Sequence, residues 1–135
     1  MLDIDGSFGE GGGQIVRSSL ALSLLTGKPF RLRKVRANRL PKPGLRPQHL
    51  ASVRAAAKIG RAKVSGDVVG SNQFTFQPGA VTAGEYHFNI GTAGATALVL
   101  HTVYLPLALA GASEVVLEGT PIEADVRPDF YAVRA

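Results

Sequence analysis

The segment Gly9-Glu10-Gly11-Gly12-Gly13-Gln14 has the residue types that bring a backbone close to an anion. Glycines before a helix let N–H groups approach a phosphate, and the positive end of the helix dipole favours the same ligand. Glu10 would repel a bare phosphate, and its carboxylate is better suited to a divalent cation that bridges to phosphates. A tight turn with a surface glutamate explains the same residues. The segment matches neither the dinucleotide-binding fingerprint nor the Walker loop.

A second group of candidate residues surrounds a proline-rich segment. Arg36 and Arg39 lie just before Pro43-Gly-Leu-Arg-Pro-Gln-His49. Guanidinium groups in a loop braced by prolines are suited to bidentate phosphate binding, because the loop has already lost much of its entropy. Gln48 and His49 open the next predicted helix, where side chains and free N–H groups reach the same anion. A solvated basic loop with a capping histidine is the alternative interpretation.

The remaining histidines carry weaker signals. His101 lies in the middle of an apolar predicted helix, where a hydrogen-bonded core histidine is commoner than a catalytic one, and His87 lies on a predicted strand. The spacing of His49, His87 and His101 matches no metal-ligand pattern. With no cysteine in the sequence, thiolate metal sites and a cysteine nucleophile are excluded.

Charge is strongly segregated along the chain. The net charge is +5, but the stretch from Gly11 to Gly66 contains no Asp or Glu and 13 of the 15 Lys and Arg residues. A solvated face usually mixes both signs. The acid-free stretch therefore predicts a polyanionic partner, either nucleic acid or a nucleotide phosphate.

Composition and length indicate a globular protein. The chain has 135 residues, of which 45% are hydrophobic. Residues 91–113 lack charged side chains, but glycines, a proline and His101 interrupt the stretch, so we interpret it as a buried helix rather than a membrane span. The N-terminus has no signal-peptide pattern. We expect a soluble, cytoplasmic protein.

The elements that must position these residues follow from periodicity and from Gly and Pro signals. Helices are expected at Gln14–Thr26 and Gln48–Ile59, with a loop over residues 40–47 between them. Strands are expected on either side of these helices, at Leu2–Asp5, Pro29–Val35, Ala62–Ser65 and Gln73–Gln77.

The pattern then begins again at an offset of 84 residues, with a strand at Tyr86–Ile90, a helix at Ala95–Ala110 and a strand at Glu114–Leu117. This predicts an α+β fold of repeated βαβαββ units, each with two helices on a four-stranded sheet. Residues 1–84 would form the first unit and 85–135 an incomplete second one. Its strands would lack partners and one helix face would stay uncovered, which predicts a homodimer or a complementing chain.

Three strings taken together resemble the RNA 3′-terminal phosphate cyclase family. They are Asp5-Gly-Ser…Glu10-Gly-Gly-Gly-Gln-Ile-Val-Arg17, Pro43-Gly-Leu-Arg-Pro-Gln-His-Leu50 and Ile90-Gly-Thr-Ala-Gly94. The resemblance covers nearly the whole chain and implies the same repeated βαβαββ units. It implies ATP-dependent conversion of an RNA 3′-phosphate to a 2′,3′-cyclic phosphate through a histidine–AMP intermediate.

The resemblance also implies roles for individual residues. Glu10 resembles the glutamate that contacts a divalent metal (Mg²⁺ or Mn²⁺), His101 lies where the family has a glutamine that contacts ATP, and Pro128 lies near the adenine pocket. The residues that match the family's phosphate-binding set are Arg17, Arg36, Arg39, Gln48 and His49.

The sequence departs from the family pattern in small insertions, in Glu118-Gly119-Thr120, and in length. The family's nucleophilic histidine would lie beyond Ala135, and neither His49, His87 nor His101 matches it. We therefore expect the N-terminal portion of a cyclase, without a catalytic residue. A non-catalytic, cyclase-like RNA-binding protein is the alternative, and a truncated chain without function is a third.

Overall fold

The computed structural model describes residues 1–7, 12–92, 95–120 and 129–134. It has the α+β fold that the sequence predicts, with two sheets and three helices among these residues. The elements in chain order are β1 (Leu2–Asp5), α1 (Gln14–Thr26), β2 (Phe30–Arg33), α2 (Pro47–Gly60), β3 (Lys63–Ser65), β4 (Phe74–Gln77), β5 (Glu85–Thr92), α3 (Thr96–Ala110), β6 (Glu114–Thr120) and β7 (Asp129–Arg134).

The first six elements have the expected βαβαββ order and form a four-stranded sheet with strand order β1-β2-β4-β3. β1 pairs with β2 in parallel, as a crossover through α1 requires, and β4 pairs antiparallel with both β2 and β3. Phe30 and Phe74 meet edge to face with ring centroids 5.6 Å apart, and Phe30 stacks on Phe76. These three buried rings cover the helix side of the sheet.

Helix α1 shows how the sequence sets the bounds of an element. Its buried residues Val16, Leu20 and Leu24 recur at the helical period and face the core. The helix stops at Gly27, whose φ of 73° is left-handed and whose N–H donates to the carbonyl of Ser23. The predicted bounds of this helix are therefore confirmed.

The second sheet has the order β5-β6-β7 and corrects the expectation of unpaired strands. β5 pairs in parallel with β6, and β6 pairs antiparallel with β7. β7 was not expected from the sequence, and it supplies the partner that the predicted incomplete unit lacked. β6 begins at Glu114, 84 residues after β2 begins at Phe30, which agrees with the predicted offset.

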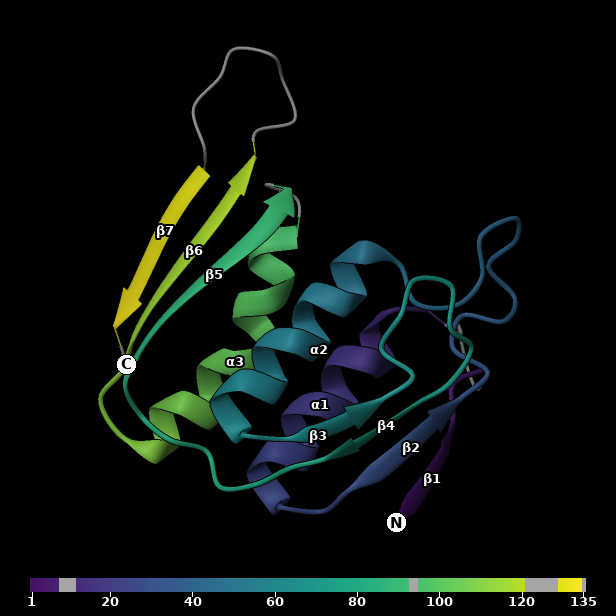
Figure 1. The fold of residues 1–135 in the computed structure, drawn as a ribbon, viewed down its shortest axis with the longest axis horizontal. Helices are drawn as coiled ribbons and strands as arrows, with labels where there is room; N and C mark the ends of the chain where they lie inside the picture. Colours follow the sequence, from purple (N-terminus) through teal and green to yellow (C-terminus); the bar gives the residue numbers. More distant parts are fainter. Residues whose placement is uncertain (8–11, 93–94, 121–128, 135) are drawn as a thin grey trace.

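The two sheets enclose the helices (Figure 1). Helix α3 packs against both α1 and α2, so buried residues of the two predicted units form one hydrophobic core. The division of the chain at residue 84 lies between β4 and β5 and stays an interpretation. Figure 1 also shows that the three helices run in similar directions, so their N-termini lie toward the same end of the molecule.

Helix α3 is less buried than expected. Val99, Val103 and Leu107 face the core, but His101, Tyr104, Leu105 and Leu109 are exposed on the other side. Although apolar residues occur on every face of α3, only one face of this helix is buried. No helix in the described residues is both long and apolar enough to cross a bilayer.

Candidate phosphate-binding site

A cavity of about 360 Å³ lies where α1, α2 and the loop before α2 come together, beside the first turn of α3. All five residues predicted to bind phosphate line it. The full lining is Gly12, Gly13, Arg17, Arg36, Arg39, Gln48, His49 and Leu98. The structure thus brings together side chains from positions 17 to 49, although their function stays a prediction.

Helix α1 contributes its glycine-bearing N-terminus and Arg17. The Arg17 guanidinium donates to Gln14 Oε1 over 2.6 Å, which holds it beside the start of the helix. A Cβ added at Gly13 would overlap Nε2 of the His49 ring, and one at Gly12 would lie 3.0 Å from a guanidinium nitrogen of Arg39. Glycine at these positions therefore allows the two clusters predicted from the sequence to approach closely.

Arg36 both lines the cavity and braces its loop. It has a left-handed φ of 47°, and its Nη1 donates to the carbonyl oxygens of Lys42 at 3.1 Å and Gly44 at 3.0 Å. Its pKa is lowered by burial and by the nearby charges of Arg39 and Arg46. A guanidinium held this way fixes the proline-rich loop against the cavity, a structural role that the sequence did not reveal.

His49 is buried in the first turn of α2, which begins with Arg46 at the N-cap and Pro47 at the first helical position. Its Nδ1 accepts the backbone N–H of Arg46 over 3.0 Å. In the neutral ring the proton therefore lies on Nε2, on the side of Gly13 and the cavity. Burial first, and then the charges of Arg36, Arg17 and Arg46, lower the pKa of His49 to about 4.

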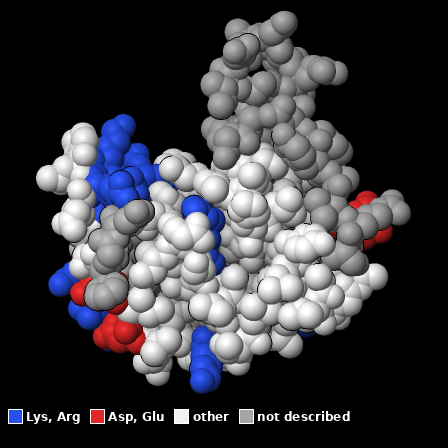
Figure 2. Space-filling model, turned by 180° about the vertical axis from the view of Figure 1, so that it is seen from behind, with Lys and Arg blue, Asp and Glu red and all other residues white. Residues whose placement is uncertain are grey.

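The electrostatics of the cavity favour an anion. Its described lining contains three arginines, a neutral imidazole and no Asp or Glu. Burial is the main cause of the lowered pKa values of Arg36 and His49, and the neighbouring arginine charges lower both further. An anion between these groups would relieve the repulsion among the cations. The N-terminal ends of α1 and α2 add their dipoles. Figure 2 shows the largest group of Lys and Arg side chains at one edge of the molecule, with smaller groups near the centre and at the bottom of this view.

Of the other predicted site residues, His101 is described by the structure and does not line this cavity. His101 is exposed on α3, so the alternative of a buried core histidine is wrong. His87 is on β5, where its Nε2 lies 2.9 Å from Glu118 Oε2. Glu10 and Pro128 lie outside the described residues. Within the ranges that the structure describes, no three His, Asp or Glu side chains gather as metal ligands.

Leu98 is the one lining residue that sequence reasoning missed altogether. It lies in the first turn of α3 and brings that helix to the cavity. The repeat offered a signal, since Leu98 follows Gln14, the first residue of α1, by the same 84 residues. Corresponding helices of a repeated unit start at corresponding places, so the first turn of the third helix was a candidate lining segment.

The sequence model of the RNA 3′-terminal phosphate cyclase family matches residues 8–134. A protein of Caldivirga maquilingensis named RNA 3′-terminal phosphate cyclase is 57% identical over 120 residues, which cover 89% of this chain and 34% of the relative. Relatives with the same name from Sulfurisphaera tokodaii and Nostoc punctiforme are each 54% identical, and the matches cover 88% of this chain and 35% and 36% of those proteins. The chain thus spans about a third of the length of the curated relatives it matches.

Proposed function

The chain belongs to the RNA 3′-terminal phosphate cyclase family, and on that basis we propose that its cavity binds the terminal phosphate of an RNA 3′ end. The observation that carries this proposal is the convergence of Arg17, Arg36, Arg39, Gln48 and His49 on one acid-free cavity. Arginine guanidinium groups give directional, charge-assisted hydrogen bonds to phosphate oxygens. The Nε2–H of His49 adds a neutral donor fixed by its hydrogen bond with Arg46.

We propose that the chain is the N-terminal portion of an enzyme that converts an RNA 3′-phosphate to a 2′,3′-cyclic phosphate with ATP and a divalent cation. ATP would supply the activated adenylyl group for this cyclisation. The cavity would also suit ATP phosphates, because the same cations and helix ends favour any phosphate. Glu10 is our candidate metal ligand, with His101 and Pro128 as candidate nucleotide contacts.

The histidines of this chain fit binding better than covalent chemistry. Nδ1 of His49 is occupied by a backbone hydrogen bond, His87 is paired with Glu118, and His101 lies outside the cavity. A nucleophile needs a free nitrogen in line with the reacting phosphorus. We therefore assign no catalytic residue to this chain. This also supports the alternative function, a cyclase-like RNA-binding protein without catalysis.

Incubation with α-labelled ATP and Mg²⁺ or Mn²⁺ separates these functions. The 135-residue chain should acquire no acid-labile label, because it supplies stabilising groups and no nucleophile. A label that disappears in His49→Ala or His101→Ala would contradict that assignment. Cyclisation of a 3′-phosphorylated RNA after addition of the remaining part of a relative would support the enzyme portion, and continued inactivity would support the binding protein.

The phosphate contacts are tested by the salt dependence of RNA binding. Each phosphate neutralised on a single strand contributes about −0.7 to the slope of log affinity against log salt. The variant Arg17→Ala with Arg39→Ala should bind more weakly and with a shallower slope. Lys28→Ala with Arg61→Ala, which removes two exposed cations outside the cavity, is the matched control. Equal losses in both variants would contradict a specific site.

A further inference from the structure

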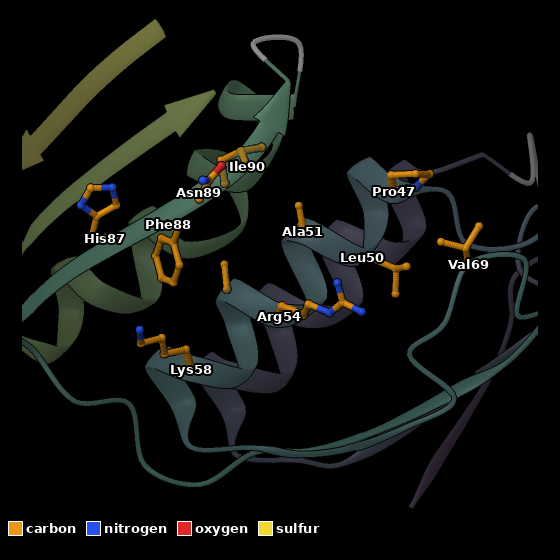
Figure 3. A pocket seen from close by; sticks show the side chains of 11 residues that line it. Pro47, Leu50, Ala51, Arg54, Lys58, Val69, His87, Phe88, Asn89 and Ile90 are labelled. Carbon is orange, nitrogen blue, oxygen red and sulfur yellow. The ribbon is translucent and has the colours of Figure 1, made fainter. Parts of the chain in front are cut away.

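A second cavity, of about 400 Å³, lies between α2 and β5 and shares no lining residue with the phosphate site (Figure 3). One wall is the face of α2 from Pro47 to Lys58, and the other is His87 to Ile90 of β5. Val69, from the loop after β3, closes one end. We refer to this cavity as the α2–β5 groove. The proposed RNA chemistry makes no use of it.

The strand wall of the groove is a backbone edge. Four consecutive residues of β5 line it, although neighbouring side chains of a strand point to opposite faces. Phe88 and Ile90 belong to the helix side of the sheet, and His87 and Asn89 to the other side. A groove that contacts both sides must run along the edge of the strand. β5 is the outer strand of its sheet, with β6 as its strand partner among the described residues.

An edge strand presents backbone N–H and C=O groups that pair with any extended chain of suitable sequence. β5 is eight residues long, which is long enough for several such hydrogen bonds. The groove places this edge opposite a helix, so an added strand would be covered on one side by α2. Strand addition of this kind takes its affinity from the main chain and its specificity from alternate side chains.

The side chains of the groove define that specificity. Its floor is apolar, with Leu50, Ala55 and Phe88 all buried. Arg54 and Lys58 are exposed on the α2 wall, and Lys58 Nζ lies 6.0 Å from the centre of the Phe88 ring. No lining residue is an Asp or Glu, and the lining carries the cations Arg54 and Lys58. The charge of the groove lining is therefore positive.

The spacing of the two cations also matches a strand. Arg54 and Lys58 are four residues apart on a helix, which separates them by about 6 Å along its axis. Alternate side chains of a strand are about 6.6 Å apart on the same face. In the view of Figure 3, the axes of α2 and β5 are nearly parallel, one on each side of the groove. Carboxylates at alternate positions of an added strand would therefore meet both cations.

We propose that the α2–β5 groove binds an extended peptide segment that adds to β5 as a further strand, with acidic side chains at alternate positions facing Arg54 and Lys58. An RNA strand fits the groove less well. The Phe88 ring is only 9% exposed and stacks on Tyr86, so it offers no free face to a base. The apolar floor would also remove water from phosphates without supplying hydrogen bonds.

Fluorescence anisotropy with a labelled, capped peptide Thr-Glu-Thr-Glu-Thr-Val-Thr tests this proposal. We expect saturable binding that is weakened about tenfold or more by Arg54→Glu with Lys58→Glu, because two attractive pairs become repulsive. Arg61→Glu with Lys63→Glu makes the same charge change outside the groove and should change the affinity less than about twofold. A peptide with Lys in place of Glu should not bind.

Two further measurements separate strand addition from charge attraction alone. Ala51→Trp, which fills the groove from a partly exposed helix position, should abolish binding while the circular dichroism spectrum stays unchanged. Amide resonances of β5 should shift on binding, and N-methylation of alternate peptide nitrogens should prevent it. Binding that survives Ala51→Trp or N-methylation would overturn the proposal. Competition with single-stranded RNA provides a second contradictory outcome. The proposal would be overturned if RNA displaced the peptide, and if RNA affinity fell in Arg54→Glu with Lys58→Glu but not in Arg61→Glu with Lys63→Glu.

Discussion

Neutral His49 among three arginines is the feature of the phosphate site that sets its pH dependence. Its Nδ1 is occupied by the N–H of Arg46, and its pKa is about 4. The unfolded chain therefore takes up the proton first as the pH falls. Between about 6.5, the ordinary value, and about 4, this residue makes the folded state progressively less stable.

We expect sulfate, whose charge is constant over this range, to raise the pKa of His49 by opposing Arg36 and Arg17. An NMR titration of the His49 ring protons, with and without sulfate, measures this shift. In His49→Gln the free energy of unfolding should depend less on pH between 6.5 and 4. A pKa unchanged by saturating sulfate would show that the anion binds away from the imidazole.

We expect the alanine variants of Arg36 and Arg39 to differ in how much the free energy of unfolding falls. Arg36→Ala loses two hydrogen bonds to loop carbonyls, so we expect a loss of about 1–3 kcal/mol in the free energy of unfolding together with weaker phosphate binding. Arg39→Ala removes an exposed side chain, so we expect weaker phosphate binding with a smaller loss in the free energy of unfolding than in Arg36→Ala. Urea unfolding and RNA titration of both variants check the difference. Equal stability losses would contradict the bracing role of Arg36.

At the scale of elements, the junction between α1 and α2 depends on Gly13. Gly13→Ala should push His49 from its position, because a Cβ there overlaps its ring, and should therefore weaken phosphate binding about tenfold or more. Gly84→Ala is the matched control, since its Cβ would meet no atom within 4 Å and its φ is not left-handed. Binding of 3′-phosphorylated RNA by the two variants measures the effect. A Gly13→Ala variant that binds normally would show that this close approach is unnecessary.

Most elements were predictable because their signals are local. Gly27 ends α1, Pro47 opens α2, and the strands before and after each helix alternate or carry Gly and Pro at their ends. β7 was missed because the second unit does not repeat the first at this point. In the first unit the parallel pair β1 and β2 is followed by α2, whereas in the second unit the parallel pair β5 and β6 is followed by the antiparallel strand β7. The half-exposed state of α3 was missed because a uniformly apolar helix has no polar face to indicate solvent.

The candidate site was predictable to a lesser degree. The residue types and the family resemblance selected all five polar side chains that line the cavity. The bracing bonds of Arg36 and the tautomer of His49 depend on how the loop before α2 folds, and no residue pattern in the sequence specifies that conformation. The approach of Leu98 depends on the packing of α3 beside α1 and α2, for which the repeat offset was the one available signal.

At the scale of the whole molecule, apolar side chains remain exposed on two helices. Leu22 on α1 is 60% exposed, and Leu109 on α3 is 71% exposed, with Tyr104 and Leu105 also accessible. Such surfaces invite association. The predicted homodimer or partner chain remains a prediction that sedimentation can check. We expect concentration-dependent association that decreases in Leu105→Glu with Leu109→Glu, and a monomer at high concentration would contradict it.

The central claim is that the cavity recognises the phosphate at an RNA 3′ end. The most direct measurement compares the dissociation constants of one RNA oligonucleotide ending in a 3′-phosphate and in a 3′-hydroxyl, at fixed salt. We predict that the phosphorylated end binds about tenfold or more tightly, because the terminal phosphate adds charge-assisted hydrogen bonds to the arginines. Arg17→Ala with Arg39→Ala should remove this preference, and Lys28→Ala with Arg61→Ala should keep it. Equal affinity for the two ends in the unmodified chain would contradict the claim.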